Sequence, residues 1–167
     1  MARQRHFPAI NWLNSYSLYP QSLDQWFRDN IAQDFPEIRT QVSGLLQIES
    51  ELQEIVQLVG SDALPVDQQL TLEVARMIRE FFLQQNGFHE VDAYCDINLQ
   101  YKMAKAILSF QESAKSAMAS GAQLNDVVNV QSRTDLMRGR FEKGYVDDID
   151  DMVKKMTAEI AGTVEGN

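Results

Sequence analysis

The chain has 167 residues, of which 15 are Lys or Arg and 24 are Asp or Glu, so its formal net charge is −9. This length corresponds to one domain, and an apolar content of 44% is enough for a packed core. The acidic balance argues against nucleic-acid binding, because no basic stripe is available for phosphate contacts. A single cysteine, Cys95, excludes a disulfide framework and a structural zinc site. No apolar run approaches the roughly 20 residues that span a bilayer, so we expect no membrane insertion.

The amino-terminal stretch, residues 6–19, is apolar and aromatic but has neither a helical nor a strand period. Pro8 disfavours helical backbone at Phe7, and several Asn and Ser residues favour irregular backbone. We therefore predict a non-helical aromatic leader over residues 1–20. It is expected to lie against another surface, because its large side chains are too apolar for free solvent. These side chains are Phe7, Ile10, Trp12, Tyr16 and Tyr19.

Helical periodicity dominates residues 21–167, and the 8 Gly and 4 Pro of the chain occur at only a few places. Ser22 followed by Gln25 predicts a capping box at the start of a first helix. Pro36 is expected in the first turn of a long second helix, because its missing N–H costs nothing there. Gly60 is expected to end that helix.

The remaining Pro and Gly residues and the helical periodicity between them predict five further helices. Pro65 is expected to restart the chain as a third helix, and Gly87 suits a left-handed cap at its end. A fourth helix is predicted over about 97–120, with Gly121 after it. Shorter helices are predicted at 124–128, 133–137 and 146–160, and residues 162–167 are expected to fray. The predicted fold class is therefore an all-α, multi-helix bundle.

Motifs that would carry catalysis or metal binding are incomplete. Gly139 and Gly144 have the spacing of a phosphate loop, but Tyr145 and Val146 follow where Lys and Ser/Thr are required. His89-Glu90 has no second histidine at zincin spacing. The acidic cluster over 147–151 lacks the Gly and Glu of a calcium loop. We therefore predict no catalytic residue and no metal ligand, and we assign these acids to the first turn of a helix.

Two features leave alternatives open. Between Gly44 and Asp67 there are five acids and no Lys or Arg, which is typical of a solvated face or of a docking surface for a basic partner. These acids are Glu49, Glu51, Glu54, Asp62 and Asp67. Phe7 and Phe88 could pack in the core or stack on a flat ring such as a nucleobase. Their spacing does not decide between the two.

Three blocks of sequence point to a family. They are residues 6–19 (HFPAINWLNSYSLY), residues 51–60 (ELQEIVQLVG) and residues 70–79 with 82–88 (LTLEVARMIR and FLQQNGF). In this order they resemble the catalytic A subunit of archaeal/vacuolar-type (A/V-type) rotary ATPases. The first block resembles the segment that leaves the nucleotide-binding domain, and the others resemble the carboxy-terminal helical domain. The resemblance covers the chain to about Tyr101 and, less distinctively, the remainder.

The resemblance implies roles for particular residues. Phe7 matches an aromatic residue that stacks on the adenine of bound ATP, and Phe88 matches the second aromatic residue of that pocket. The turn after Gly60 matches an acidic loop of the similar F-type β subunit, which bears on the rotor. The corresponding residues are Asp62, Ala63, Leu64, Pro65 and Asp67. Only Asp62, Leu64 and Asp67 keep the chemistry of that loop.

The family also implies what this chain lacks. The phosphate loop, the catalytic Glu and the magnesium ligands of the family lie upstream, so we expect no ATP hydrolysis by this segment alone. ATP or ADP with Mg would be bound by the parent subunit. Implied partners are the B subunits and the central-stalk rotor subunits, in a cytoplasmic head peripheral to the membrane. The rival hypotheses are a free-standing helical adaptor that binds a basic partner through its acidic face, and a ligand-binding or catalytic bundle with the leader as a lid.

Overall fold

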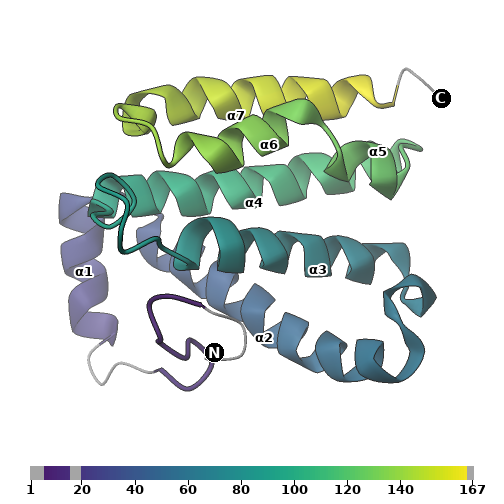
Figure 1. Ribbon diagram of the computed structural model, residues 1–167, viewed down its shortest axis with the longest axis horizontal. Helices are drawn as coiled ribbons and strands as arrows, with labels where there is room; N and C mark the ends of the chain where they lie inside the picture. The colour runs from purple at the N-terminus through teal and green to yellow at the C-terminus, as the bar shows by residue number, and fades with distance from the viewer. Residues whose placement is uncertain (1–5, 16–19, 165–167) are drawn as a thin grey trace.

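The structure, a computed structural model, describes residues 6–15 and 20–164 of the chain (Figure 1). All regular structure in these ranges is helical, which confirms the predicted all-α fold class. The elements are α1 (Pro20–Asn30), α2 (Phe35–Val59), η2 (Ser61–Ala63), α3 (Val66–Met77), the π-helix η3 (Ile78–Leu83), α4 (Ile97–Ala119), α5 (Leu124–Val128), α6 (Gln131–Gly139) and α7 (Tyr145–Gly162).

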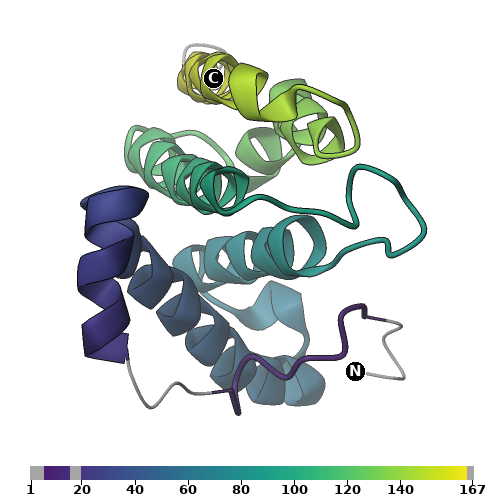
Figure 2. The same cartoon turned by 90° about the vertical axis from the view of Figure 1, so that its left-hand side faces the viewer.

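The long helices stack in layers. α2 and α3 form a hairpin with η2 at its turn, and α4 runs alongside α3 and contacts both helices of the hairpin (Figure 1). α6 and α7 pack on the other side of α4, and α1 stands beside α2 (Figure 2). The amino-terminal segment and the end of α7 lie on opposite sides of the molecule.

One continuous core joins the hairpin to the carboxy-terminal helices. α2, α3 and η3 supply apolar side chains to it from one side, and α4, α6 and α7 supply them from the other. The largest fully buried members include Leu70, Val74, Phe81, Ile107, Phe110, Leu136, Ile149 and Met156. Since burial of one such side chain is worth about 1.5–3 kcal/mol, this shared core holds the two halves of the chain together.

The proline and glycine predictions for α2 are confirmed. Pro36 lies in the first turn of α2, and Gly60 follows its last residue with φ of 84°, a left-handed value that glycine adopts at little cost. Pro65 directly precedes α3, and α4 ends at Ala119, just before Gly121. Residues 6–15 contain no helix, in line with the predicted leader. Tyr16 and Tyr19 lie outside the described residues.

Two capping predictions were wrong. α1 begins at Pro20, a residue type favoured in the first turn, so Ser22 lies inside the helix and not at its N-cap. The third helix widens into η3 and ends at Leu83, where Gln84 is already extended, and Gly87 lies farther along the loop. Its last carbonyls are bound by the side chain of Arg140, from a distant part of the chain, so no glycine cap is needed.

Candidate functional site

Phe7 and Phe88 meet at one hollow on the surface. The side chain of Phe7 is 53% exposed and that of Phe88 is fully exposed, which excludes the core-packing interpretation for both rings. They line a cavity of about 640 Å³ together with the residues just before Phe88 and with two residues from a third part of the chain. Its lining is Phe7, Gln84, Gln85, Asn86, Gly87, Phe88, Arg140 and Phe141. We call this hollow the aromatic cavity.

Contacts to the backbone of η3 and of the residues just after it hold the leader in place. The amide of Gln85 donates to the carbonyl oxygen of Phe7 at 2.7 Å. Nε2 of His6 lies 3.3 Å from the carbonyl oxygen of Arg79, and the His6 ring packs on Trp12 with 5.1 Å between centroids. These contacts bring Phe7 to the loop that carries Phe88, although the two residues are far apart in the sequence.

Asp92 organises the loop that carries Phe88. Its carboxylate is almost fully buried, and Oδ2 accepts a hydrogen bond from the amide of Asn86 at 2.5 Å. The backbone oxygen of Asp92 accepts from the side-chain amide of Gln85 at 3.2 Å. The amide of Phe88 in turn donates to Oδ1 of Asn86 at 3.1 Å. These polar groups of the short loop are therefore paired internally, and the ring of Phe88 is left pointing to solvent.

Arg140 and Phe141 form the third wall of the cavity, and neither residue was predicted from the sequence. The Arg140 guanidinium carbon lies 4.6 Å from the centroid of the Phe141 ring, and the His89 ring packs edge-on against Phe141 at 5.1 Å. Both residues come from the connection between α6 and α7. No local pattern marks them, because their contacts are made with residues far earlier in the chain.

The predicted rotor-contact residues form the turn between α2 and α3 (Figure 1). This turn lies at the opposite end of α3 and η3 from Gln84 to Phe88, which line the aromatic cavity. Most of them are exposed, but the side chain of Leu64 is 6% exposed and belongs to the interior of the turn. Nε2 of Gln69 donates to the carbonyl oxygen of Leu64 at 2.8 Å. Exposed apolar side chains of Leu58 and Val66 flank the turn. The exposed predicted residues are Asp62, Ala63, Pro65 and Asp67.

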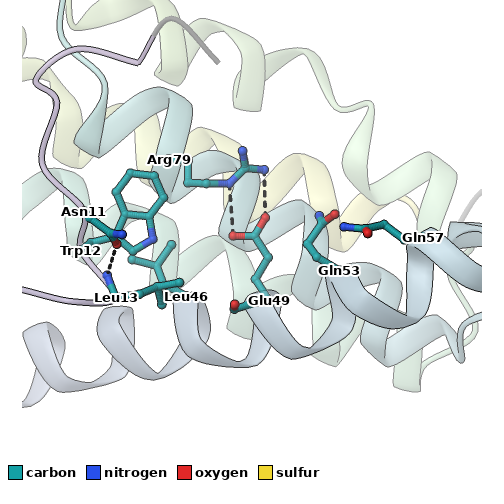
Figure 3. A pocket seen from close by; sticks show the side chains of 9 residues that line it. Asn11, Trp12, Leu13, Leu46, Glu49, Gln53, Gln57 and Arg79 are labelled. Atoms are coloured by element: carbon teal, nitrogen blue, oxygen red, sulfur yellow. Dashed lines mark hydrogen bonds and ion pairs between the residues drawn. The ribbon is translucent and has the colours of Figure 1, made fainter. Parts of the chain in front are cut away.

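The acidic face predicted between Gly44 and Asp67 is smaller than expected, because Glu49 is buried. Its carboxylate is paired with Arg79 through two contacts, at 2.9 Å to Nη2 and 3.1 Å to Nε (Figure 3). Burial raises the pKa of Glu49 despite the opposing charge of Arg79. The prediction of a solvated face was therefore wrong for Glu49, while Glu51 and Glu54 are exposed.

The Glu49–Arg79 pair forms the floor of a second hollow, of about 430 Å³, between α2 and the leader (Figure 3). Trp12 and Leu46 border it at one end, and Gln53 and Gln57 continue it along α2. Because the charges of Glu49 and Arg79 neutralise each other, the described lining of this hollow offers no free charge to a ligand.

Within residues 6–15 and 20–164 no three His, Cys, Asp or Glu side chains are grouped as metal ligands would be. Across the same ranges, no helix has both the length and the apolar character needed to cross a membrane. Asp147 and Asp148 lie in the first turn of α7, as predicted.

Comparison with known proteins adds the family. Residues 24–128 match the family model described as the C-terminal domain of V and A type ATP synthase. The A subunit of the A-type ATP synthase of Methanosarcina barkeri is 50% identical over 161 residues, which cover 96% of this chain and 28% of that protein. Its counterpart in Methanosarcina mazei is 49% identical over an equal span, and that of Methanoregula boonei is 48% identical over 159 residues, covering 95% of this chain and 27% of the relative. The chain thus spans a little over a quarter of the length of these curated relatives.

Proposed function

The chain belongs to the family of C-terminal domains of V and A type ATP synthases, and from this membership we propose that it serves a rotary, ion-translocating ATPase or ATP synthase as the helical domain of its catalytic subunit. It would couple ATP hydrolysis or synthesis to movement of the rotor. The observation that carries this proposal is the separation of two exposed features on one rigid hairpin. The aromatic cavity lies at one end, and the turn of Asp62 to Asp67 lies at the other.

At the first end, Phe7 and Phe88 would stack on the adenine of the bound nucleotide. Their exposed faces support this role, because an aromatic ring can stack on a base without a hydrogen-bond code. The cavity of about 640 Å³ is within the usual size range of ligand pockets. The phosphates and Mg would be held by the upstream part of the parent subunit, where the catalytic groups of the family lie.

At the other end, the turn between α2 and α3 would bear on the central-stalk rotor subunits. The 25 residues of α2 correspond to a rigid arm of about 38 Å, long enough to convert a small rotation near the nucleotide into a larger displacement of the turn. Asp62, Pro65 and Asp67 are exposed for contact, and Leu64 would hold the turn from inside. Nucleotide binding can bias such a movement only if the aromatic contacts differ between the open and closed states.

The proposed setting is the cytoplasmic head of the complex, peripheral to the membrane, with B subunits as neighbours. An antibody against this chain, used on a blot of source-cell extract, tests the setting directly. A band several times heavier than 19.1 kDa that sediments with membranes is expected. A band at 19.1 kDa that stays in the supernatant would overturn the setting and favour the free-standing adaptor. Its binding face would be the exposed acids Glu51, Glu54, Asp62 and Asp67.

The adenine role is tested with Phe88→Ala in the assembled complex. Loss of one stacking ring is expected to weaken ATP binding about three- to tenfold. Tyr94→Ala is the matched control, because Tyr94 is also strongly exposed but does not line the aromatic cavity. An unchanged dissociation constant for ATP in Phe88→Ala would refute the role.

The rotor role is tested at the turn with Pro65→Ala combined with Asp67→Asn. We expect the variant to bind ATP normally and to lose torque in a single-molecule rotation assay. Leu64→Ala is expected to impair rotation by loosening the turn itself, since this side chain is buried. Normal torque in the Pro65→Ala/Asp67→Asn variant would argue against contact through this turn.

A further inference from the structure

We propose that Arg140 is a positioning residue for the aromatic cavity, through which the connection between α6 and α7 sets the placement of Phe88 and Phe141. This inference rests on the proposed adenine-binding function. Arg140 follows the last residue of α6, and its side chain is 11% exposed. It therefore reaches the cavity from the connection between α6 and α7 and not from the loop after η3 that carries Phe88.

The first contact of Arg140 is with the end of η3. Nη1 lies 2.8 Å from each of three carbonyl oxygens, those of Glu80, Phe81 and Gln84. The last carbonyls of a helix have no partner within the helix, so a buried cation is well suited to bind them. By holding the oxygen of Gln84, Arg140 restrains the point where the chain leaves η3 and enters the loop of Phe88.

The second contact is with the buried carboxylate that organises the same loop. Nε of Arg140 is 3.7 Å from Oδ1 of Asp92, and the other oxygen of Asp92 accepts from the amide of Asn86 at 2.5 Å. Asn86 then accepts from the amide of Phe88. One guanidinium thus compensates the buried charge of Asp92 and reaches the backbone of Phe88 through two intermediates. A buried carboxylate without this partner would be costly.

The third contact uses the flat face of the guanidinium. Arg140 lies over the ring of Phe141 at 4.6 Å, and both residues line the aromatic cavity. A guanidinium can bind carbonyls with its edge while it stacks with its face, whereas a lysine ammonium is a point charge without such a face. Arg140→Lys is therefore expected to keep the charge and lose the placement of Phe141.

The test compares two probes on the full-length catalytic chain within its complex. ATP carries the base, and inorganic tripolyphosphate presents phosphates without it. Arg140→Lys and Arg140→Met are expected to weaken ATP binding about three- to tenfold and to leave tripolyphosphate binding unchanged. Arg138→Met, which removes an exposed cation just before Arg140, is the matched control and is expected to leave both unchanged.

Each outcome separates this inference from the function on which it rests. Equal weakening for ATP and tripolyphosphate would overturn it, since Arg140 would then support the fold as a whole. Unchanged ATP binding in Arg140→Lys and Arg140→Met, with weakened binding in Phe88→Ala, would also overturn it while keeping the adenine site. Unchanged ATP binding in Phe88→Ala would refute the adenine site itself. If Arg140→Met does not assemble, Arg140→Lys and Asp92→Asn carry the test, with selective loss of ATP binding expected in both.

Discussion

The ring of Phe7 lies directly against Gly87. A β-carbon built on Gly87 would be 3.1 Å from Cε1 of Phe7 and 3.3 Å from Cζ, closer than side chains normally approach. The absence of a side chain at position 87 is therefore what allows the leader to lie on the loop of Phe88. Glycine is required at position 87 because the Phe7 ring packs closely against it, and not because the backbone there is left-handed.

Gly87→Ala is expected to displace the ring of Phe7 by a few tenths of an ångström. In the assembled complex this should weaken ATP binding by about two- to fivefold, because the stacking geometry of one wall changes. Gly44→Ala serves as the control, since apart from its chain neighbours and its own helix backbone no described residue lies within 4 Å of its β-carbon. Equal affinities in these two variants would show that the contact between Phe7 and Gly87 has no bearing on the nucleotide.

Gly139→Ala is expected to destabilise the chain. A β-carbon there would overlap Cε2 of Tyr145, whose ring is buried and whose hydroxyl donates to the carbonyl oxygen of Leu136 at 2.8 Å. Forcing this ring aside should cost about 1–3 kcal/mol. Thermal unfolding of the 167-residue chain, followed by circular dichroism, measures the change in Tm. Gly162→Ala, with no close neighbour among the described residues, is the control; an identical Tm for both variants would contradict the prediction.

Cys95 is expected to be a slow nucleophile in the folded chain. Burial, followed by the negative charges of Asp92 and Asp96, raises the pKa of Cys95 from 9.0 to about 11. At a pH of about 8 this corresponds to roughly 100-fold less thiolate than an ordinary cysteine holds. The rate of alkylation by iodoacetamide, measured from neutral pH to beyond the folded pKa, should rise with a midpoint near 11 in the folded chain. In urea the midpoint should return to its ordinary value, and a folded midpoint near 9.0 would refute the prediction.

Asp34 ties the start of α2 to α4. Its Oδ1 accepts from the Tyr101 hydroxyl at 2.7 Å and its Oδ2 from Nζ of Lys105 at 3.1 Å. The hydrogen bond from Tyr101, with help from Lys105, lowers the pKa of Asp34 below 3.8. A lowered folded pKa stabilises the fold above the unfolded value, and this contribution is lost as the pH falls through the folded value.

Tyr101→Phe should therefore reduce the free energy of unfolding by about 0.5–1 kcal/mol at neutral pH, a small loss because Asp34 is half exposed. The difference from the unmodified chain should narrow as the pH falls below 3.8 and through the lower folded pKa of Asp34, where its carboxylate becomes protonated. Urea unfolding of both chains, at neutral pH and at two acidic pH values on either side of 3.8, measures this difference in the free energy of unfolding. If the difference stays constant over this pH range, the hydrogen bond between Tyr101 and the charged form of Asp34 contributes nothing to the free energy of unfolding.

Helices could be predicted from the sequence where the signal is local. Pro36 lies in the first turn of α2 and Gly60 directly follows its last residue, as expected. Both positions could be predicted because the missing N–H is a property of proline itself and the tolerance of a left-handed φ is a property of glycine itself. The predicted glycine cap at the end of the third helix failed because another part of the chain binds the last carbonyls there. Arg140 binds the carbonyls at the end of η3, so the chain has no need of a glycine cap at position 87.

The amino-acid sequence by itself determined the all-α class, the ends of α2 and the family, because these depend on periodicity, residue type and the order of three sequence blocks. Only the tertiary structure decided which side chains share a surface. It buried Glu49 against Arg79, turned Leu64 inward, and brought Phe7, Phe88 and Phe141 around one cavity. The physical reason is that the packing of α4 and of the connection after α6 against the hairpin joins residues far apart in the chain, and no local pattern encodes such a contact.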